Sequence, residues 1–270
     1  MTGFTIPGVN DSGVGTMLRD WRQRRRRTQL DLALDAGIST RHLSFLETGR
    51  SRPSAEMLLT LSEHLELPLR ERNRLLLAAG FAPRYQQREL DSPELAAVRD
   101  AIGHVLTGHE PYPAFVVDPI WNMVASNAAL AVLLEDVAPE LLHPPVNVMR
   151  VALHPEGLAP RILNLAEYRG RLLARLTRDV QLHGDPRVQE LLEEVSGYPG
   201  PDIAAGHNGY DVAAITMQLH LASSFGELRL FSTIAAFGTA LDVTVAELSL
   251  EAFFPADPET AEALRNAAGT

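Results

Sequence analysis

The sequence predicts a two-domain α+β protein, in which an all-α domain of five short helices precedes a five-stranded antiparallel sheet domain with helices. Up to residue 80, apolar residues recur at helical spacing between glycine and proline stops. From residue 113, and again after residue 211, short runs alternate as strands do. The charge also changes sign, because residues 1–90 carry 14 Arg against 10 acidic residues and residues 91–270 carry 10 Arg against 24.

The five helices of the first domain follow one another with short turns. Leu30, Ala33 and Leu34 give the second helix its apolar spacing, and Gly37 suits a turn that needs positive φ. Ser39 is a natural N-cap for the third helix. The helices are expected at about residues 16–26, 29–36, 39–48, 54–67 and 69–79.

The third helix has the pattern of a helix that enters a DNA major groove. Leu43 and Leu46 are three residues apart and must face the core. The opposite side is then free to read base edges, with arginine suited to guanine and an aromatic or methyl group to thymine. The residues expected to read bases are Thr40, Arg41, Ser44 and Phe45.

Residues around this helix are expected to bind DNA phosphates, which sets affinity rather than sequence preference. These residues are Gln29, Arg27, Ser39, His42, Arg50 and Arg52. Three alternatives stay open: Phe45 packs inward in part, the arginine run 24–27 is only a solvated face, and Arg22 with Glu47 forms a structural ion pair.

The stretch TQLDLALDAGISTRHLSFLETGRSRPS closely resembles the Xre/Cro-like helix-turn-helix family, over residues 16–80. The resemblance implies that Gln29, Thr40, Arg41 and Ser44 match positions that contact DNA. It also implies that the pairing of Arg22 with Glu47 is structural.

The second domain has two early strands and three late ones, with helices between them. Pro119 separates the early strands, which are expected as a hairpin. The strands are expected at 113–118, 121–125, 211–223, 227–238 and 243–254, and the main helices at 93–106, 164–182 and 187–195. The expected domain organisation is a flexible N-terminus at 1–13, a helix-turn-helix domain at 14–81, a linker at 82–92 and the sheet domain at 93–270.

Residues 92–270 resemble the ligand-binding domain of MmyB-like transcriptional regulators, which has a PAS-like fold. The resemblance is carried by YPAFVVDPIWNMVASNAA, NVMRVALHPEG, LNLAEYRGRLLARL, and ELRLFSTIAAFGTALDVTVAELSLEAFFPAD with the following PET. It implies a hydrophobic, fatty-acid-like ligand. The candidate pocket residues are Phe115, Trp121, Arg150, His154, Met217, Leu219, Leu230, Phe231 and Phe237, of which Arg150 and His154 could meet an acidic head group.

The composition excludes several classes of function. The chain has no cysteine, so it has no disulfide and no thiolate metal site. It shows no signal peptide, no long apolar span and no hydrolase, nucleotide-binding or metalloprotease motif, so neither catalytic nor metal-binding residues are expected.

We therefore expect a cytoplasmic, bacterial-type, one-component transcription regulator. It would bind a palindromic DNA operator as a homodimer and respond to a hydrophobic small molecule, with no other cofactor and no membrane partner. Two alternatives stay open: the acidic domain is a protein-docking module without a ligand, or it is an enzyme that the helix-turn-helix tethers to DNA.

Overall fold

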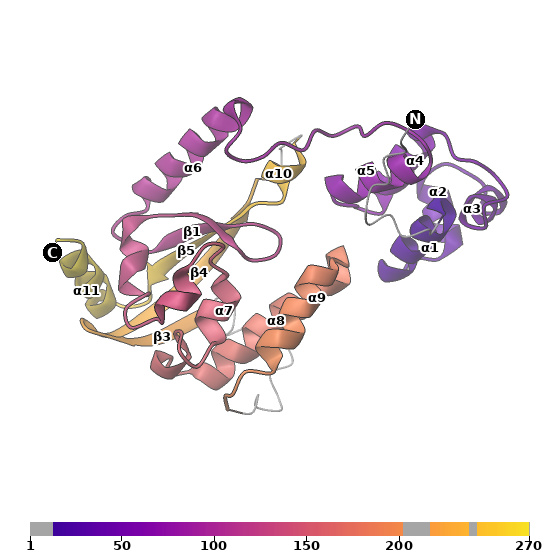
Figure 1. The fold of residues 1–270 in the computed structure, drawn as a ribbon. Coiled ribbons are helices and arrows are strands. Elements are labelled where there is room, and N and C mark those ends of the chain that lie inside the picture. The colour runs from indigo at the N-terminus through magenta and orange to yellow at the C-terminus, as the bar shows by residue number, and fades with distance from the viewer. Residues whose placement is uncertain (1–12, 202–216, 238–241, 270) are drawn as a thin grey trace. The chain divides into compact units, whose positions relative to one another are not determined.

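A computed structural model describes residues 13–201, 217–237 and 242–269 of the chain (Figure 1). It divides into two compact units, residues 1–87 with 241–243, and residues 88–240 with 244–270. None of the helices among the described residues is long and apolar enough to cross a membrane.

The first unit contains five helices around one leucine-rich core. Leu18, Leu32, Leu43, Leu46 and Leu58 are fully buried there, and Trp21 packs beside them. The helices are α1 (Val14–Arg24), α2 (Gln29–Asp35), α3 (Thr40–Glu47), α4 (Ala55–His64) and α5 (Leu69–Ala78).

Side-chain caps begin three of these helices where the sequence places small hydroxyl residues. Thr28 forms a capping box with Asp31 at α2, and Ser39 accepts the backbone N–H of His42 at α3. Ser54 does the same for Met57 at α4. Each cap satisfies a backbone donor that the helix itself leaves unpaired, so the short helices begin at defined residues.

Only part of the apolar spacing expected for α2 is buried. Leu32 and Ala33 are buried, whereas Leu30 and Leu34 are 65% and 76% exposed. Positions four apart share one face of a helix, and Leu32 lies on the other face. The apolar spacing of Leu30 and Leu34 therefore identified the helix but not the side that packs.

The second unit contains a five-stranded antiparallel sheet with the strand order β2-β1-β5-β4-β3. Its strands are β1 (Ala114–Val117), β2 (Met123–Ser126), β3 (Met217–Ser223), β4 (Gly226–Ala236) and β5 (Ser249–Pro255). Its helices are α6 (Ala96–Gly108), α7 (Val148–Leu153), α8 (Leu165–His183), α9 (Pro186–Ser196), α10 (Val243–Ala246) and α11 (Pro258–Ala268), with 3₁₀ turns η1 (Pro93–Leu95), η2 (Ala128–Val132), η3 (Pro139–Leu142) and η4 (Ala159–Arg161).

The two faces of the sheet carry separate apolar clusters. Figure 1 shows α6 on one side of the strands and α7, α8 and α9 on the other. On one face, Ile102 and Leu106 of α6 pack against Ala114 and Val116 of β1. On the other face, helices α7, α8 and α9 form the larger cluster, into which Phe115 points. Successive strand residues point to opposite faces, so alternate residues of one strand serve the two clusters.

Two local predictions for this unit need correction, and part of a third is not tested. Residues 243–246 form the helical turn α10 rather than the start of a strand, and β5 begins only at Ser249. In the hairpin, Trp121 has a φ of 68° and precedes the second strand. Residues 211–216 of the predicted third strand lie outside the described residues. The alternating pattern did not separate a helical turn from the strand that follows it.

Residues 82–92 contain neither a helix nor a strand, but their backbone is anchored. The Asn73 Oδ1 atom accepts the N–H groups of Arg84 and Tyr85 at 2.9 and 3.0 Å. The Asn73 amide also donates to the Tyr85 carbonyl at 2.7 Å. Further along, Thr244 Oγ1 donates to the Arg88 carbonyl at 2.5 Å. These hydrogen bonds hold defined residues of the segment to one unit or the other.

Candidate functional site

Helix α3 presents a polar side away from the core of the first unit. Leu43 and Leu46 are fully buried, as their spacing predicts. Arg41 is exposed, and Thr40 and Ser44 are half-buried on the other side. A rigid helix with its inward side fixed by two leucines can present these polar groups together to a DNA groove.

Phe45 is half-buried and lies between two arginines. The guanidinium carbons of Arg41 and Arg50 are 5.3 and 6.0 Å from the centre of its ring. Such cation–π contacts contribute about 0.5–1 kcal/mol at exposed sites. Phe45 therefore orients two candidate DNA-binding arginines in addition to its own partial packing.

A buried hydrogen-bond network links α1, α2 and α3. Arg22 donates to both carboxylate oxygens of Glu47, from Nε at 2.6 Å and from Nη2 at 2.9 Å. Arg22 Nη1 also donates to the Arg27 carbonyl at 2.7 Å, and Gln29 Nε2 donates to Glu47 at 2.7 Å. The structural ion pair between Arg22 and Glu47 is thus present, and the Gln29 side chain is anchored to it.

The environment of Glu47 favours its charged form. Burial raises the pKa of this carboxyl group, but the hydrogen bonds from Arg22 and Gln29, with the positive charge of Arg22, together outweigh burial and lower the pKa. The same pair raises the pKa of Arg22, chiefly through its hydrogen bond to Glu47. Both groups therefore stay ionised inside the unit.

Arg25 and Arg27, two members of the arginine run 24–27, bind partners within the first unit. Arg27 pairs with Asp35 and donates to the His64 carbonyl at 3.1 Å. Arg25 donates to the carbonyls of Leu65 and Glu66 at 2.9 and 3.0 Å. The last carbonyls of a helix lack intrahelical partners, so these arginines satisfy the end of α4. Arg27 is consequently engaged inside the unit rather than held out toward a phosphate.

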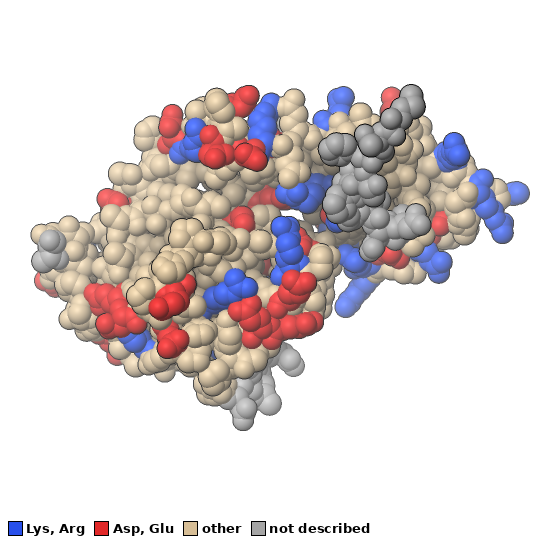
Figure 2. All heavy atoms as spheres, in the orientation of Figure 1, with Lys and Arg blue, Asp and Glu red and all other residues tan. Residues whose placement is uncertain are grey.

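The remaining candidate phosphate contacts lie at the ends of α3. Ser39 caps the helix with its hydroxyl oxygen, and the half-buried His42 follows it. Arg50 and Arg52 are exposed after the C-terminal end of the helix. On the face that Figure 2 shows, basic side chains gather over this unit and acidic ones are frequent over the other unit.

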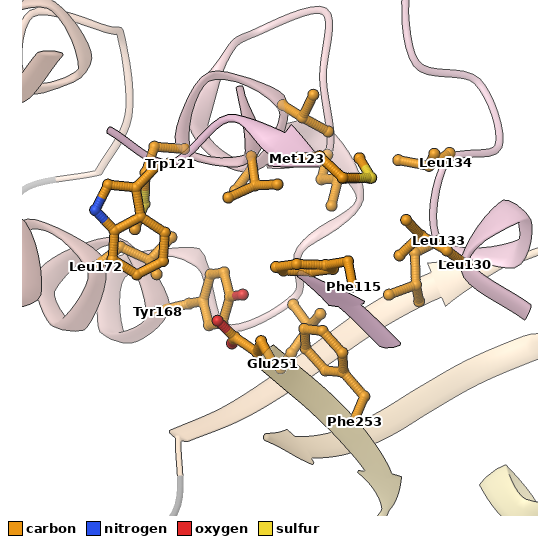
Figure 3. Close-up of a pocket in the computed structure, with 16 residues that line it drawn as sticks. Phe115, Trp121, Met123, Leu130, Leu133, Leu134, Tyr168, Leu172, Glu251 and Phe253 are labelled. Atoms are coloured by element: carbon orange, nitrogen blue, oxygen red, sulfur yellow. The ribbon is translucent and has the colours of Figure 1, made fainter. Parts of the chain in front are cut away.

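The second unit holds a pocket that sixteen residues line (Figure 3). Most of these residues belong to β1, β2, β3, β5, α7 and α8, and the others lie in the hairpin turn, in η2 and the residues that follow it, and at Leu158. They lie on the face of the sheet that carries the larger apolar cluster. The pocket holds about 550 Å³ of empty space, the solvent at its mouth included. This total includes interstices and open solvent, so it is not an enclosed cavity volume. The feature that suits a small molecule is the mainly apolar lining.

Three of the predicted pocket residues line this pocket, namely Phe115, Trp121 and Leu219. Leu230 is fully buried in the cluster behind the lining. Met217 begins β3, and its side chain lies outside the described residues.

Phe231 and Phe237 face away from the pocket. The ring of Phe231 stacks on Phe254 at 5.3 Å, and Phe254 and Phe237 pack against the cluster on the opposite face of the sheet. Strand alternation explains the error, because a shift of one residue exchanges the two faces.

Arg150 and His154 do not line the pocket either. Arg150 donates two hydrogen bonds to Glu194, at 2.8 and 2.7 Å, near the surface. His154 lies edge-on to the ring of Tyr198 at 5.0 Å. The positive charge of Arg150 on α7 is thus paired with Glu194 on α9 and does not reach the pocket. The predicted site for an acidic head group is therefore absent from this pocket.

The polar groups that do reach the pocket were not predicted. Tyr168 of α8 and Glu251 of β5 both line it, and Arg175 Nη1 donates to Glu251 at 3.0 Å. Arg175 also lies over the Trp121 ring at 4.0 Å, and the Trp121 indole N–H donates to Asp179 at 3.2 Å. The one signal in the sequence was a lone carboxylate within the apolar run LSLEAFF, since a charge in a buried strand requires a partner.

A helical unit with an exposed polar recognition helix, followed by a sheet unit with an apolar pocket, defines a DNA-binding regulator with a ligand-binding domain. The helix-turn-helix family model matches residues 18–72. The model described as "MmyB-like transcription regulator ligand binding domain" matches residues 98–267. The chain therefore belongs to the family of MmyB-like transcription regulators.

One solved structure similar to the chain is described as that of an RNA-binding light-oxygen-voltage receptor, with 14% sequence identity and a TM-score of 0.26. The similarity covers 96% of this chain, which spans 62% of the length of that receptor. No curated protein matches the chain.

Proposed function

We propose that this DNA-binding transcription regulator is a one-component sensor. In this proposal it binds a palindromic operator as a homodimer, and a small hydrophobic ligand in the second unit modulates that binding. The apolar pocket carries the proposal, because it gives a unit of a DNA-binding protein a place for a small molecule.

DNA recognition would centre on Arg41. An exposed arginine on a recognition helix can donate two hydrogen bonds to the O6 and N7 atoms of guanine. The ring of Phe45 supports its guanidinium, which reduces the freedom that binding would remove. Thr40 and Ser44 flank it, and Arg50 and Arg52 supply positive charge for phosphates.

Dimerisation follows from the short reach of a single recognition helix. One helix reads only a few base pairs, whereas two related half-sites, about 10 base pairs apart, multiply the specificity. The ligand would act by binding one arrangement of the dimer more tightly than another. A tenfold change in DNA affinity requires a coupling free energy of about 1.4 kcal/mol.

Two measurements on the full chain test this proposal. Native mass spectrometry of protein purified without delipidation should show a dimer that carries a stoichiometric apolar molecule. Selection from random DNA should return inverted half-sites. A monomer on asymmetric sites contradicts the dimeric part of the proposal, and a protein that no added apolar molecule stabilises or releases from DNA contradicts the sensor part.

A protein-docking role for the second unit is the competing function. A filled core without a cavity would have favoured that role, and the pocket favours a ligand instead. The two functions differ in one measurable respect: a docking module keeps its DNA affinity whichever apolar molecule is added.

A further inference from the structure

The pocket has one polar end, formed by Tyr168 and Glu251 (Figure 3). Glu251 pairs with Phe115 across the antiparallel strands, so both side chains stand on the pocket face of the sheet. The Tyr168 side chain comes from α8, and Figure 3 shows its hydroxyl oxygen and the Glu251 carboxylate at the same end of the pocket. Apart from these two residues, the lining consists of aliphatic, methionine, phenylalanine and tryptophan side chains.

Glu251 retains an acceptor for a ligand. It is 4% exposed, and its Oε2 atom accepts the hydrogen bond from Arg175. Within the part of the chain that the structure describes, its Oε1 atom accepts no hydrogen bond, and this oxygen keeps a little accessible surface. A buried carboxylate oxygen with unused lone pairs favours a donor on whatever fills the cavity.

Tyr168 supplies the complementary donor. Burial, and next the charge of Glu251, raise the pKa of this phenol, so the hydroxyl keeps its proton at neutral pH. Its hydroxyl forms no hydrogen bond among the described residues, and an O–H group can both donate and accept.

The positive charge nearest to this end is already engaged. Arg175 is not among the lining residues, and its guanidinium lies over Trp121 while it donates to Glu251. A ligand carboxylate beside Glu251 would lose its hydration and meet a like charge. A ligand ammonium would lose its hydration against a carboxylate that Arg175 already neutralises. An uncharged head group avoids both costs.

We propose that the pocket selects an uncharged apolar molecule that carries a hydroxyl group, an inference that rests on the proposed ligand-binding function. The ligand hydroxyl donates to Glu251 Oε1 and accepts from Tyr168 Oη, while its hydrocarbon part lies among Phe115, Leu130 and Leu172. Free carboxylates of the same chain length are selected against.

Three probes with equal chains test the head group: dodecan-1-ol, dodecanoate and dodecylammonium. Each is titrated at neutral pH into the full chain freed of bound lipid, against a fluorescent apolar reporter. The alcohol should bind at least about tenfold more tightly than dodecanoate, since a lost charged hydrogen bond and a like-charge contact are each of that order. Equal or tighter binding of dodecanoate or dodecylammonium overturns the inference and leaves the ligand function intact.

Two variants and a control locate the selectivity. Glu251→Gln should bring dodecanoate closer to the alcohol, because a neutral amide of the same shape removes the repulsion. Tyr168→Phe should weaken the alcohol several-fold and change dodecanoate little. Leu130→Ala should weaken both probes alike. Selectivity that neither Glu251→Gln nor Tyr168→Phe changes contradicts the assignment. If Glu251→Gln fails to fold, Tyr168→Phe and the wild-type comparison decide it. Failure of all three probes to bind overturns the ligand function and this inference with it.

Discussion

At the scale of single residues, Glu47 joins three helices of the DNA-binding unit through Arg22 and Gln29. The side chains of Arg22 and Glu47 are 10% and 1% exposed. Breaking a buried ion pair leaves one charge without a partner, which costs about 3–5 kcal/mol. The network therefore sets the position of α3 against its neighbours.

We expect Glu47→Ala to lower the free energy of unfolding of the first unit by about 3 kcal/mol or more, because Arg22 stays buried without its partner. Urea denaturation followed by circular dichroism measures this. The double variant Arg22→Met with Glu47→Leu is the matched control and should recover most of the loss. A loss below about 1 kcal/mol in the single variant contradicts the role given to the pair.

The same pair predicts a pH dependence. The pKa of Glu47 is lower in the folded unit than its ordinary value of 4.5, so the unfolded chain binds the proton first. The stability from this group is present above that value and disappears as the pH falls through the folded pKa. In acid the wild type should lose more stability than the double variant. If the free energy of unfolding changes with pH in the same way in both proteins, Glu47 does not contribute to the pH dependence of stability.

Arg41 is the residue on which base recognition should depend. Arg41→Ala should cost about 1–3 kcal/mol of discrimination between the selected operator and a mutated site. Quantitative gel shifts measure both affinities. Arg74→Ala is the control, because Arg74 lies on α5 and pairs with Glu71. If Arg41→Ala lowers the affinity for both sites equally, this arginine contacts a phosphate rather than a base.

At the scale of elements, the close contact of α1 with α3 depends on a glycine. A Cβ atom on Gly15 would lie 2.3 Å from the Leu46 carbonyl oxygen. That distance is too short for any side chain, and the obstacle is backbone. The recognition helix is thus positioned from behind by Gly15 and by the Arg22–Glu47 network.

Gly15→Ala should destabilise the first unit by about 1–3 kcal/mol, the usual cost of overpacking, and weaken DNA binding. Gly103→Ala provides the opposite case, because a Cβ at this exposed position of α6 meets nothing within 4 Å. Alanine there should stabilise its helix by about 0.5–1 kcal/mol. Thermal unfolding of both variants distinguishes them, and a neutral Gly15→Ala would show that α1 can move away from α3.

The hydrogen bonds of the buried Asn127 join several elements, and the local sequence pattern does not predict them. Asn127 directly precedes the 3₁₀ turn η2, yet its side chain makes no cap there. Its Oδ1 atom accepts the Ala114 N–H, and its amide donates to the carbonyls of Leu106 and Tyr112. A single buried asparagine thus joins α6, β1 and the loop before β1, which no spacing in the sequence indicates.

At the scale of the whole molecule, the separation of charge predicts a salt effect on the DNA-binding function. The affinity for DNA should fall steeply as salt rises, because each phosphate neutralised by arginine releases a counterion. Arg50→Ala or Arg52→Ala should each reduce the slope of log K against log salt by about 0.9. Arg25→Ala should leave the slope unchanged, since Arg25 binds the end of α4. An equal change of slope in all three variants contradicts the view that Arg50 and Arg52 bind phosphates while Arg25 stabilises the end of α4.

By itself the sequence determined the two-domain α+β organisation, the five N-terminal helices and the inward leucines of α3. These features follow from local periodicity, caps and turn residues, which act over a few neighbours. The tertiary structure alone decided the buried side of α2, the use of Arg25 and Arg27, and the polar end of the pocket. Glu251 lies far along the chain from Tyr168 and Arg175, which both belong to α8, and only strand register and the packing of α8 bring it to them. Local pattern specifies which element forms, whereas non-local packing specifies which of its faces is used.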